Sequence, residues 1–255
     1  MTDQWERTER LVGREGFKRL RQATVVVFGL GGVGSFCVEA LARSGVGTLR
    51  IIDHDVVSLS NCNRQLHAMQ STVGRAKVDI MRDRITNIDP EIRVDARRAF
   101  FAQDTADSLL EGPPSFVVDA VDALGPKVEL LMQCRDRGIP VIAAMGAAAR
   151  MDPTRVRISR LEDTSGDPLA SRVRKMLRRR GGLRGITAVH STEPARATAE
   201  GDWQVMTDDL FRGRQRFIQP SMTMVPATMG FAAAAEVVSC LIGEPSLTAR
   251  RRPLR

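Results

Sequence analysis

The stretch that decides the fold runs from Thr24 to Asp53 and reads TVVVFGLGGVGSFCVEALARSGVGTLRIID. A β-branched run over 24–28 leads into a glycine-rich turn over 29–34, a helical segment over 35–44 and a second β-branched run over 48–52. Strand, glycine turn, helix and strand within about thirty residues are typical of one βαβ unit. Because the two strands of such a unit are parallel, this stretch predicts a parallel sheet.

The same alternation continues toward residue 150. Helical character returns over 75–87 and 126–137, and strand character over 92–96, 115–119 and 140–144. Alternation of this kind calls for a doubly covered parallel sheet. We therefore predict an α/β fold with a Rossmann-like, mostly parallel sheet and helices on both faces.

After Arg150 the pattern loosens. We expect strands over 156–159 and 186–190, a basic helix over 168–180 and an apolar helix over 226–242. Residues 192–216 have few apolar side chains and no clear period, so we expect a long mobile loop there. The apolar stretch 225–243 approaches the length of a bilayer span. Its alanine content and Glu236 favour a buried core helix over a membrane span.

The composition is that of an ordinary globular protein. The chain has 255 residues, of which 43% are hydrophobic and 27% charged, so disordered and fibrous classes are excluded. Four cysteines occur without a C-x-x-C pair, which argues against a disulfide framework and a four-thiolate zinc site. The first 17 residues carry charges throughout and no apolar core, so we expect no secretory signal and a cytoplasmic location.

The net charge of +8 is unevenly distributed. Residues 1–149 carry 19 basic and 19 acidic side chains, so the whole excess lies in residues 150–255. Within that part, an acid-free basic run extends from Arg172 to Arg184. A lone basic run is most simply a solvated helix face, but a cationic surface is also what binding of a polyanion requires.

The glycine turn predicts a nucleotide site. Gly29, Gly31 and Gly34 match G-x-G-x-x-G, and Asp53 lies where an acidic residue would hold a ribose hydroxyl. This pattern alone does not choose the nucleotide, and NAD is the ordinary interpretation. Arg64 and Lys77 suit a triphosphate with its leaving pyrophosphate, and Asp122, just beyond a strand end, suits magnesium.

Hydride transfer needs neither these cations nor this carboxylate. The chain also has no tyrosine, which removes the Tyr/Lys acid–base pair of one large reductase class. Taken singly, Arg64 or Lys77 could be a surface charge and Asp122 a helix N-cap. Their joint occurrence around one glycine turn favours the functional interpretation.

Five motifs carry a family resemblance. In chain order they are GLGGVG at 29–34, IDHDVV at 52–57, SNCNRQ at 60–65, VGRAK at 73–77 and DAVD at 119–122. Together they resemble the nucleotide site of the ThiF/MoeB/HesA adenylyltransferases, relatives of ubiquitin-activating enzymes. Five further motifs resemble the tRNA threonylcarbamoyladenosine dehydratases (TcdA): ALARSGVG at 40–47, NCNRQLHA at 61–68, MDPT at 151–154, DPL at 167–169 and STE at 191–193.

The resemblance implies one ThiF-type adenylation domain over 1–255, with an ATP-binding part over 1–149 and a basic part over 150–255. It implies ATP-dependent adenylation of the threonyl carboxylate on a modified adenosine next to the tRNA anticodon, followed by ring closure with net loss of water. ATP and magnesium are the implied cofactors. Simple adenylation of this kind needs no protein nucleophile.

The resemblance also assigns residue roles. Asp53 would hold the ribose, Asn61, Arg64 and Lys77 the phosphates, and Asp122 the magnesium ion, beside the backbone of Gly29, Gly31, Gly32 and Gly34. Arg10 matches an arginine that enters the other subunit of a homodimer, and with Arg64, Lys77 and Asp122 it completes the implied catalytic set. We expect tRNA to bind the basic helix through Arg172, Arg174, Lys175, Arg178, Arg179 and Arg180, with Trp203 and Phe211 available for base stacking.

Several alternatives stay open. Activation of a ubiquitin-like sulfur carrier and an NAD-dependent oxidoreductase are the competing functions. A sulfur-acceptor protein of a cysteine desulfurase system is a further partner implied for some dehydratases. Residues 192–221 contain no cysteine, which weakens a thioester or persulfide mechanism. His54, His67 and His190 are expected to be structural, and the charged segment 7–21 is expected to lie outside the core.

Overall fold

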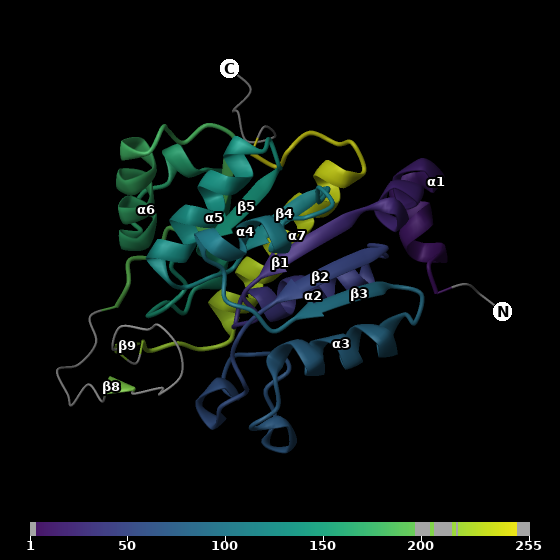
Figure 1. Cartoon of the computed structure of the whole chain (residues 1–255), viewed down its shortest axis with the longest axis horizontal. Helices are drawn as coiled ribbons and strands as arrows, with labels where there is room; N and C mark the ends of the chain where they lie inside the picture. The colour runs from purple at the N-terminus through teal and green to yellow at the C-terminus, as the bar shows by residue number, and fades with distance from the viewer. Residues whose placement is uncertain (1–3, 197–204, 207–215, 218, 249–255) are drawn as a thin grey trace.

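The computed structural model describes residues 4–196, 205–206, 216–217 and 219–248. Its main feature is a seven-stranded sheet in the order β3-β2-β1-β4-β5-β7-β6 (Figure 1). In that order the strands are β3 (Arg93–Arg97), β2 (Thr48–Ile52), β1 (Thr24–Phe28), β4 (Phe116–Asp119), β5 (Val141–Ala144), β7 (Ile186–Ser191) and β6 (Val156–Arg160). All neighbours are parallel except β6, which runs antiparallel to β7. The predicted fold class is confirmed.

Helices cover both faces of the sheet, and the alternation of side chains along the strands explains why. In β1, Val25 and Val27 belong to one core cluster while Val26 and Phe28 belong to the other. The first cluster includes buried side chains of α2 (Gly34–Arg43), α3 (Lys77–Ile88) and α7 (Met224–Leu241). The second includes side chains of α4 (Ala106–Leu109), α5 (Leu124–Asp136) and α6 (Pro168–Arg179). The strand order reverses at the β1–β4 pair, in the middle of the sheet that separates the two clusters.

The N-terminal segment corrects one expectation. Residues Glu6–Gln22 form α1, which bends at Gly13, where φ is +74°. Leu20 is fully buried in the first core cluster, and Phe17 packs against that cluster. The expectation that 7–21 lies outside the core is therefore wrong for its second half. The charged residues of this amphipathic helix face solvent, which hid the few apolar anchors in the sequence.

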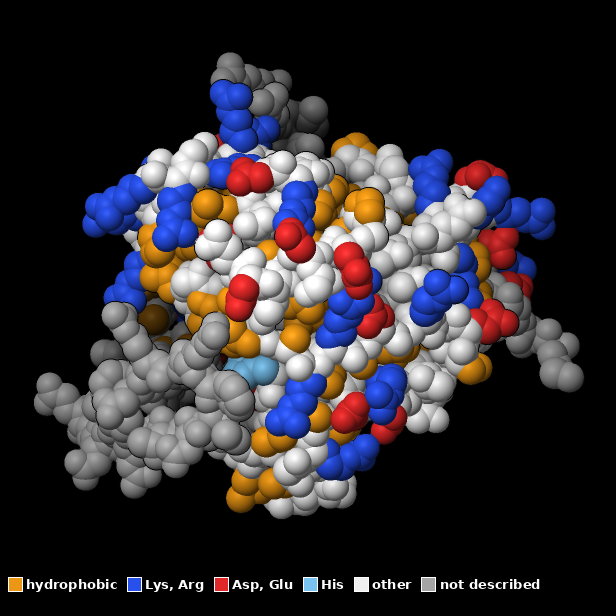
Figure 2. Space-filling view, in the orientation of Figure 1, with side chains coloured by type: hydrophobic (Ala, Val, Ile, Leu, Met, Phe, Trp, Pro, Cys, Tyr) orange, Lys and Arg blue, Asp and Glu red, His pale blue; other side chains and the backbone are white. Residues whose placement is uncertain are grey.

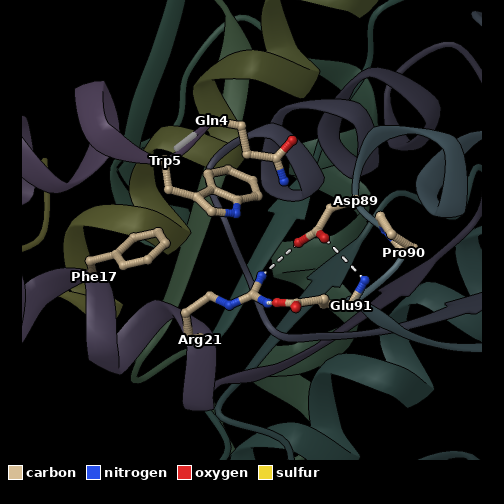
Figure 3. Close-up of a pocket in the computed structure, with 7 residues that line it drawn as sticks. All are labelled: Gln4, Trp5, Phe17, Arg21, Asp89, Pro90 and Glu91. Atoms are coloured by element: carbon tan, nitrogen blue, oxygen red, sulfur yellow. Dashed lines mark hydrogen bonds and ion pairs between the residues drawn. The ribbon is translucent and has the colours of Figure 1, made fainter. Parts of the chain in front are cut away.

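An open hollow of about 620 Å³ lies beside α1 (Figure 3). Trp5 and Phe17 form one side of it, and Arg21 lies between them and the acidic loop before β3. The Arg21 guanidinium pairs with Asp89 at 2.8 Å and with Glu91 at 3.0 Å. These pairs fasten α1 at the end of the sheet opposite the glycine turn (Figure 1).

Helix α7 is the one described helix long and apolar enough to cross a membrane. In this structure it is a core helix, as the sequence predicted, with Val225, Met229 and Val237 fully buried. Gly230 allows close packing on α2, because a Cβ there would collide with the carbonyl oxygen of Val33. The buried Glu236 accepts hydrogen bonds from the hydroxyl of Ser246 and the backbone N–H of Leu247, which satisfies a carboxylate inside an apolar helix.

The expected loop over 192–216 lies mostly outside the described residues, as do Trp203 and Phe211. Two short strands within or at the edge of this range are described, β8 (Val205–Met206) and β9 (Arg216–Phe217). They pair antiparallel with each other, which the sequence analysis did not predict. The expected mobility of this segment stays a prediction.

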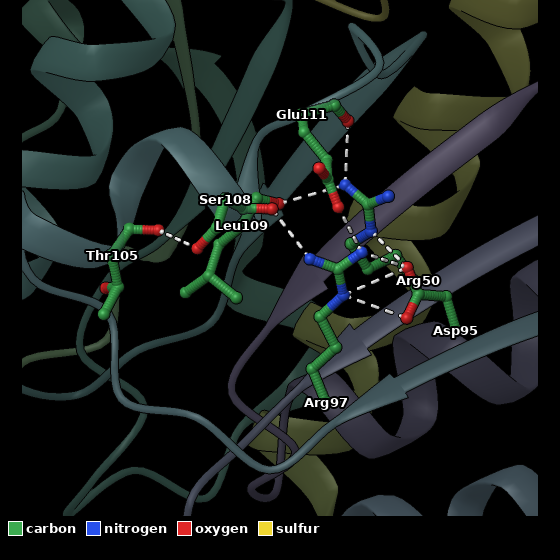
Figure 4. A network of polar contacts seen from close by, with 7 residues as sticks. All are labelled: Arg50, Asp95, Arg97, Thr105, Ser108, Leu109 and Glu111. Atoms are coloured by element: carbon green, nitrogen blue, oxygen red, sulfur yellow. Dashed lines mark hydrogen bonds and ion pairs between the residues drawn. The ribbon is translucent and has the colours of Figure 1, made fainter.

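A charged network fastens the β3 edge of the sheet (Figure 4). Asp95 on β3 accepts hydrogen bonds from Arg50 on β2 at 2.6 Å and from Arg97 on β3 at 2.8 Å. The two guanidinium groups also donate to backbone oxygens of Ser108 and Leu109 at the end of α4 and of Glu111 just after it. The network therefore ties the loop after α4 to the edge of the sheet.

We expect Asp95→Asn to lower the free energy of unfolding by about 1 kcal/mol at pH 7, a discounted value because the site is partly solvated. Hydrogen bonds from Arg97, and then from Arg50, hold the pKa of Asp95 below its usual range. The stabilisation is therefore present above about pH 4, the unfolded value, and is lost as the pH falls through the folded-state pKa. Urea unfolding at pH 7 and pH 3 checks this, with Asp104→Asn on the exposed neighbouring turn as the control. An equal loss of stability at both pH values would contradict it.

Candidate nucleotide-binding site

The four glycines after β1 are needed for different structural reasons. Gly29 has φ of +87°, and a Cβ there would lie 2.7 Å from the carbonyl oxygen of Ala120. A Cβ on Gly34 would collide with the carbonyl oxygen of Gly29, and one on Gly32 would crowd Pro226 and the backbone of Arg64. Gly31 has no atom within 4 Å of the position of its missing Cβ. Three glycines thus allow close packing, and Gly31 leaves an open face where a phosphate can approach the backbone.

Asp53 braces the glycine turn from the end of β2. One carboxylate oxygen accepts the N–H of Leu30 at 2.6 Å and the other accepts the N–H of Asp55 at 2.8 Å. The side chain is buried, with 8% exposure. Its position next to the turn agrees with the predicted ribose-binding role, which stays a prediction.

Lys77 is not the surface charge that it could have been on sequence grounds alone. It is the first residue of α3, is 4% exposed, and its Nζ lies 2.9 Å from Oδ2 of Asp55. A β-bridge between Val56 and Ala76 brings the two segments together. Asp55 is a site residue that the sequence analysis did not select, although its spacing from Asp53 within the 52–57 motif was a usable signal.

Arg64 lies on the loop that follows the 3₁₀ turn Leu59–Asn61. Its guanidinium donates to the carbonyl oxygen of Ser60 at 3.0 Å and to the side chain of Asn63 at 2.9 Å. The buried Asn61 closes the same turn by accepting the N–H of Ser58 at 3.2 Å. These contacts hold Arg64 over the glycine turn.

Arg64 and Asp122 meet across the site. Burial lowers the pKa of the Arg64 guanidinium, and the carboxylate of Asp122 opposes that shift. The N-cap of α5 is Ala123, so the interpretation of Asp122 as a helix cap is wrong. Arg64, on the loop that follows β2, and Asp122, on the segment that follows β4, are 58 positions apart in the sequence but close enough for their charges to interact.

One group among the described residues has carboxylate and imidazole atoms close enough to coordinate a cation: Asp53, His54 and Asp55. The ammonium of Lys77 already faces Asp55, and backbone N–H groups occupy both oxygens of Asp53. In this structure the group contacts the glycine turn and Lys77. Asp122 lies outside the group, and its predicted metal role depends on phosphate oxygens as co-ligands.

Two predicted site features lie away from this cluster. Arg10 is on the exposed first half of α1 and pairs with Glu6 at 2.7 Å. Helix α1 lies at the end of the sheet opposite the glycine turn (Figure 1). The basic helix α6 lies beside α5, on the side of the molecule away from α1 (Figure 1). Of its six predicted tRNA-binding residues, Arg174 is half-buried and donates to Thr164, whereas the other five are exposed: Arg172, Lys175, Arg178, Arg179 and Arg180.

The histidines are placed as structural residues. His67 is 2% exposed, and burial, Lys77 and Arg84 lower the pKa of its imidazole to about 4. His190 is also buried, and its Nε2 lies 3.0 Å from the hydroxyl of Ser159. The His67 imidazole is therefore neutral at pH 7, and burial also lowers the pKa of the His190 imidazole. His54 contacts Asp55 at 3.1 Å and stacks edge-on against Phe100.

A second polar cluster lies at the carboxyl ends of β5 and β7, and the sequence analysis missed it. The buried Arg150 donates to the carbonyl oxygens of Glu193 and Gly146 and faces Asp167 at 3.5 Å. Glu193 accepts the N–H groups of Met151 and Asp152, and Asp167 accepts that of Gly146. The motifs MDPT, DPL and STE, far apart in the sequence, therefore converge on one arginine.

The fold and this geometry define a nucleotide-binding α/β protein, with a glycine turn at the strand-order reversal and cations from the adjoining loop and helix. The chain belongs to the ThiF family, whose model matches residues 6–254. It is 40% identical over 243 residues to the tRNA threonylcarbamoyladenosine dehydratase of Bacillus subtilis, covering 95% of this chain and 96% of the relative. It is 34% identical to the Escherichia coli enzyme of the same name, covering 96% and 97%.

Solved structures agree with the sequence relatives. The E. coli tRNA N6-threonylcarbamoyladenosine dehydratase in complex with AMP superposes with a TM-score of 0.83 at 34% identity, covering 94% of this chain and 96% of that one. The same enzyme in complex with ATP gives a TM-score of 0.81 and covers 98% and 99%. The molybdopterin-synthase adenylyltransferase of Salmonella typhimurium is 38% identical, but over only 54% of each chain.

Proposed function

We propose that this protein is an ATP-dependent tRNA threonylcarbamoyladenosine dehydratase. The observation that carries the proposal is similarity to enzymes of this name along nearly the whole chain, including the part after residue 150. The carrier-activating relative matches little more than half of the chain. The MDPT, DPL and STE motifs, which resemble those of the dehydratases, all lie after residue 150 and converge on Arg150. The dehydratase is therefore favoured over a sulfur-carrier adenylyltransferase.

The proposed reaction begins with adenylation. An oxygen of the threonyl carboxylate attacks the α-phosphorus of ATP, the bond to the β-phosphate breaks, and pyrophosphate leaves. An internal nucleophile of the modified adenosine then attacks the activated carbonyl carbon, and the former carboxylate oxygen departs with AMP. ATP cleavage to AMP and pyrophosphate thus takes up the elements of the water lost in ring closure.

The residues of this chain provide position and charge for these steps. Gly31 leaves the backbone open to phosphate, and Asp53 braces the turn beside the predicted ribose site. In this proposal Arg64 and Lys77 meet the negative charge that grows on the departing pyrophosphate, and fixed cations there would stabilise the transition state. Asp55 pairs with Lys77 and thereby holds its ammonium in the site.

Magnesium is part of this proposal. An ion of this kind is commonly held by one or two carboxylates together with substrate phosphates, and Asp122 is an exposed carboxylate facing Arg64. When bound, it would neutralise charge on the phosphate oxygens. Asp122 would hold it from the segment that follows β4.

The proposed tRNA surface is the exposed face of α6. The helix begins beside the loop after β5, where Asp167 accepts hydrogen bonds from Gly146 and from Ala170. Ala170, Val173 and Leu177 are buried, so the cationic side chains point outward. Figure 2 shows Lys and Arg side chains gathered along this edge of the molecule. A cytoplasmic location follows from a tRNA substrate, and a sulfur-acceptor partner stays a prediction.

A homodimer completes the proposal. Helix α1, which carries Arg10, lies at the end of the sheet opposite the glycine turn, so in this proposal a second copy brings Arg10 to the site (Figure 1). An apolar stripe on the outer side of α7 offers a contact surface, with Met224 and Phe231 exposed and Phe231 packed edge-on against Phe36.

Mixing Arg10→Ala protein with Lys77→Met protein should restore about a quarter of wild-type activity after subunit exchange. Half of the dimers are then hybrids, and each hybrid has one site with both cations intact. Turnover of tRNA measures the effect, and each variant mixed with itself is the control. Exchange without any gain in activity would show that Arg10 does not act across subunits.

The function itself is tested by mass spectrometry of tRNA nucleosides. Incubation of threonylcarbamoyl-modified tRNA with the enzyme and ATP should yield a nucleoside lighter by one water, with AMP formed in equal amount. Formation of an adenylate on a carrier protein's C-terminus, with unchanged tRNA, would instead establish the alternative.

A further inference from the structure

A fully buried ion pair lies directly behind the candidate site. Nζ of Lys127 on α5 is 2.6 Å from Oδ2 of Asp119, the last residue of β4, and both side chains have no exposed surface. The pair joins β4 and α5, whose buried apolar side chains, including Val117, Val128 and Leu131, belong to the second core cluster. A buried pair of this kind rarely stabilises a fold more than apolar side chains of similar size would. We therefore expect the pair to fix a local conformation rather than to stabilise the fold.

The pair fixes a four-residue segment, Ala120–Ala123. The second carboxylate oxygen of Asp119 accepts the N–H of Val121 at 3.1 Å, and the N–H of Ala120 bonds to the carbonyl oxygen of Phe28 on β1. At the other end, the backbone N–H of Lys127 bonds to the carbonyl oxygen of Ala123. The ion pair thus joins the beginning and the end of this segment through the protein interior.

The segment has little freedom to shift, because it packs against the glycine turn. A Cβ on Gly29 would be 2.7 Å from the carbonyl oxygen of Ala120, and one on Gly34 would be 3.2 Å from the Cβ of Ala120. Asp122 is the third residue of the segment, and its charge acts on Arg64 across the site. A small displacement of the segment would therefore move Asp122 relative to both the glycine turn and Arg64.

We propose that Lys127, acting through Asp119, is a positioning residue that sets the location of Asp122 at the nucleotide site. Neither Lys127 nor Asp119 touches the substrate. Without the Lys127 charge, the Asp119 carboxylate can rotate and no longer holds the N–H of Val121 in place. The neighbouring side chain of Asp122 then shifts with Val121. This inference rests on the proposed function, because it takes Asp122 as the residue that meets magnesium and phosphate.

The test compares Lys127→Met with Asp122→Asn by calorimetry of ATP binding, with magnesium and with a chelator. In chelator, Lys127→Met should bind ATP within about threefold of wild type, because the contacts around Asp53 and Lys77 are intact. With magnesium, affinity should fall about tenfold, and the magnesium concentration for half-maximal activity should rise by a similar factor, as for lost orienting contacts. The decrease should appear in kcat more than in KM for ATP.

Three further variants make the result decisive. Arg137→Met removes a cation from the exposed end of α5 and should change neither binding curve. Lys127→Arg can restore the pair and should recover magnesium dependence. If Lys127→Met does not fold, Asp119→Asn with Lys127→Gln replaces the charged pair by two amides of similar size, and the same measurements apply to it.

The outcomes distinguish a failure of this inference from a failure of the proposed function. A changed magnesium titration in Asp122→Asn but an unchanged one in folded Lys127→Met overturns the positioning role alone. Unchanged titrations in both variants overturn the positioning role together with the proposed metal ligand. The third outcome is that both variants change the titration and that the double variant Lys127→Met with Asp122→Asn changes it by less than the sum of the two. This outcome supports the inference, because both substitutions then act on one contact.

Discussion

Removing either proposed phosphate-binding cation should lower the rate of adenylate formation by at least about a hundredfold, with a smaller effect on ATP affinity. This is the expected result for Arg64→Ala and for Lys77→Met, because in the proposed reaction both side chains face charge that increases as pyrophosphate departs. Lys77 is buried and paired with Asp55, so methionine, which fills the same volume, is the better replacement. Pyrophosphate exchange into ATP measures the step directly.

The matched control for these variants is Arg75→Ala. Arg75 lies two residues before Lys77, but it is exposed and pairs with Asp83 at 2.9 Å, away from the glycine turn. Its removal should leave the exchange rate within about twofold of wild type, the small effect usual for a surface ion pair. Circular dichroism should show all three variants folded. A rate near wild type for folded Arg64→Ala or Lys77→Met would remove that residue from the site.

Reversing the exposed charges of α6 should weaken tRNA binding by about a hundredfold or more at low salt and flatten its salt dependence. The variant is Arg172→Glu with Lys175→Glu and Arg179→Glu, which occupy one outward face at helical spacing. Arg174 is left in place because it holds Thr164. ATP affinity should stay unchanged, since α6 lies outside the cluster around Arg64.

The control is a second triple variant with the same change in net charge, made at exposed positions outside α6. Arg82→Glu, Arg93→Glu and Arg137→Glu alter exposed residues of α3, β3 and the end of α5. If charge alone governed tRNA affinity, both triple variants would lose it equally. A loss confined to the α6 variant assigns the surface. An unchanged salt slope in the α6 variant would leave its cations as a solvated helix face.

The sequence by itself determined the fold class and the location of the glycine turn. Short β-branched apolar runs on either side of a glycine turn and a helix specify two parallel strands, which is why 24–28 and 48–52 were predicted with their observed bounds. Glycine spacing predicted the phosphate turn, because only glycine accepts φ of +87° at Gly29 without strain. Such features depend on neighbouring residues alone, so a linear reading suffices for them.

Only the tertiary structure decided which polar residues meet. Asp55 became the partner of Lys77 through the bridge between two loops, and Lys127 became the partner of Asp119 because α5 folds back over β4. The convergence of three separate motifs on Arg150, and the burial of Leu20 within a charged helix, likewise depend on packing between elements distant in the chain. Pairings of this kind follow from the free energy of the whole core, in which a charge is buried only where another segment supplies its partner, and no local pattern contains that information.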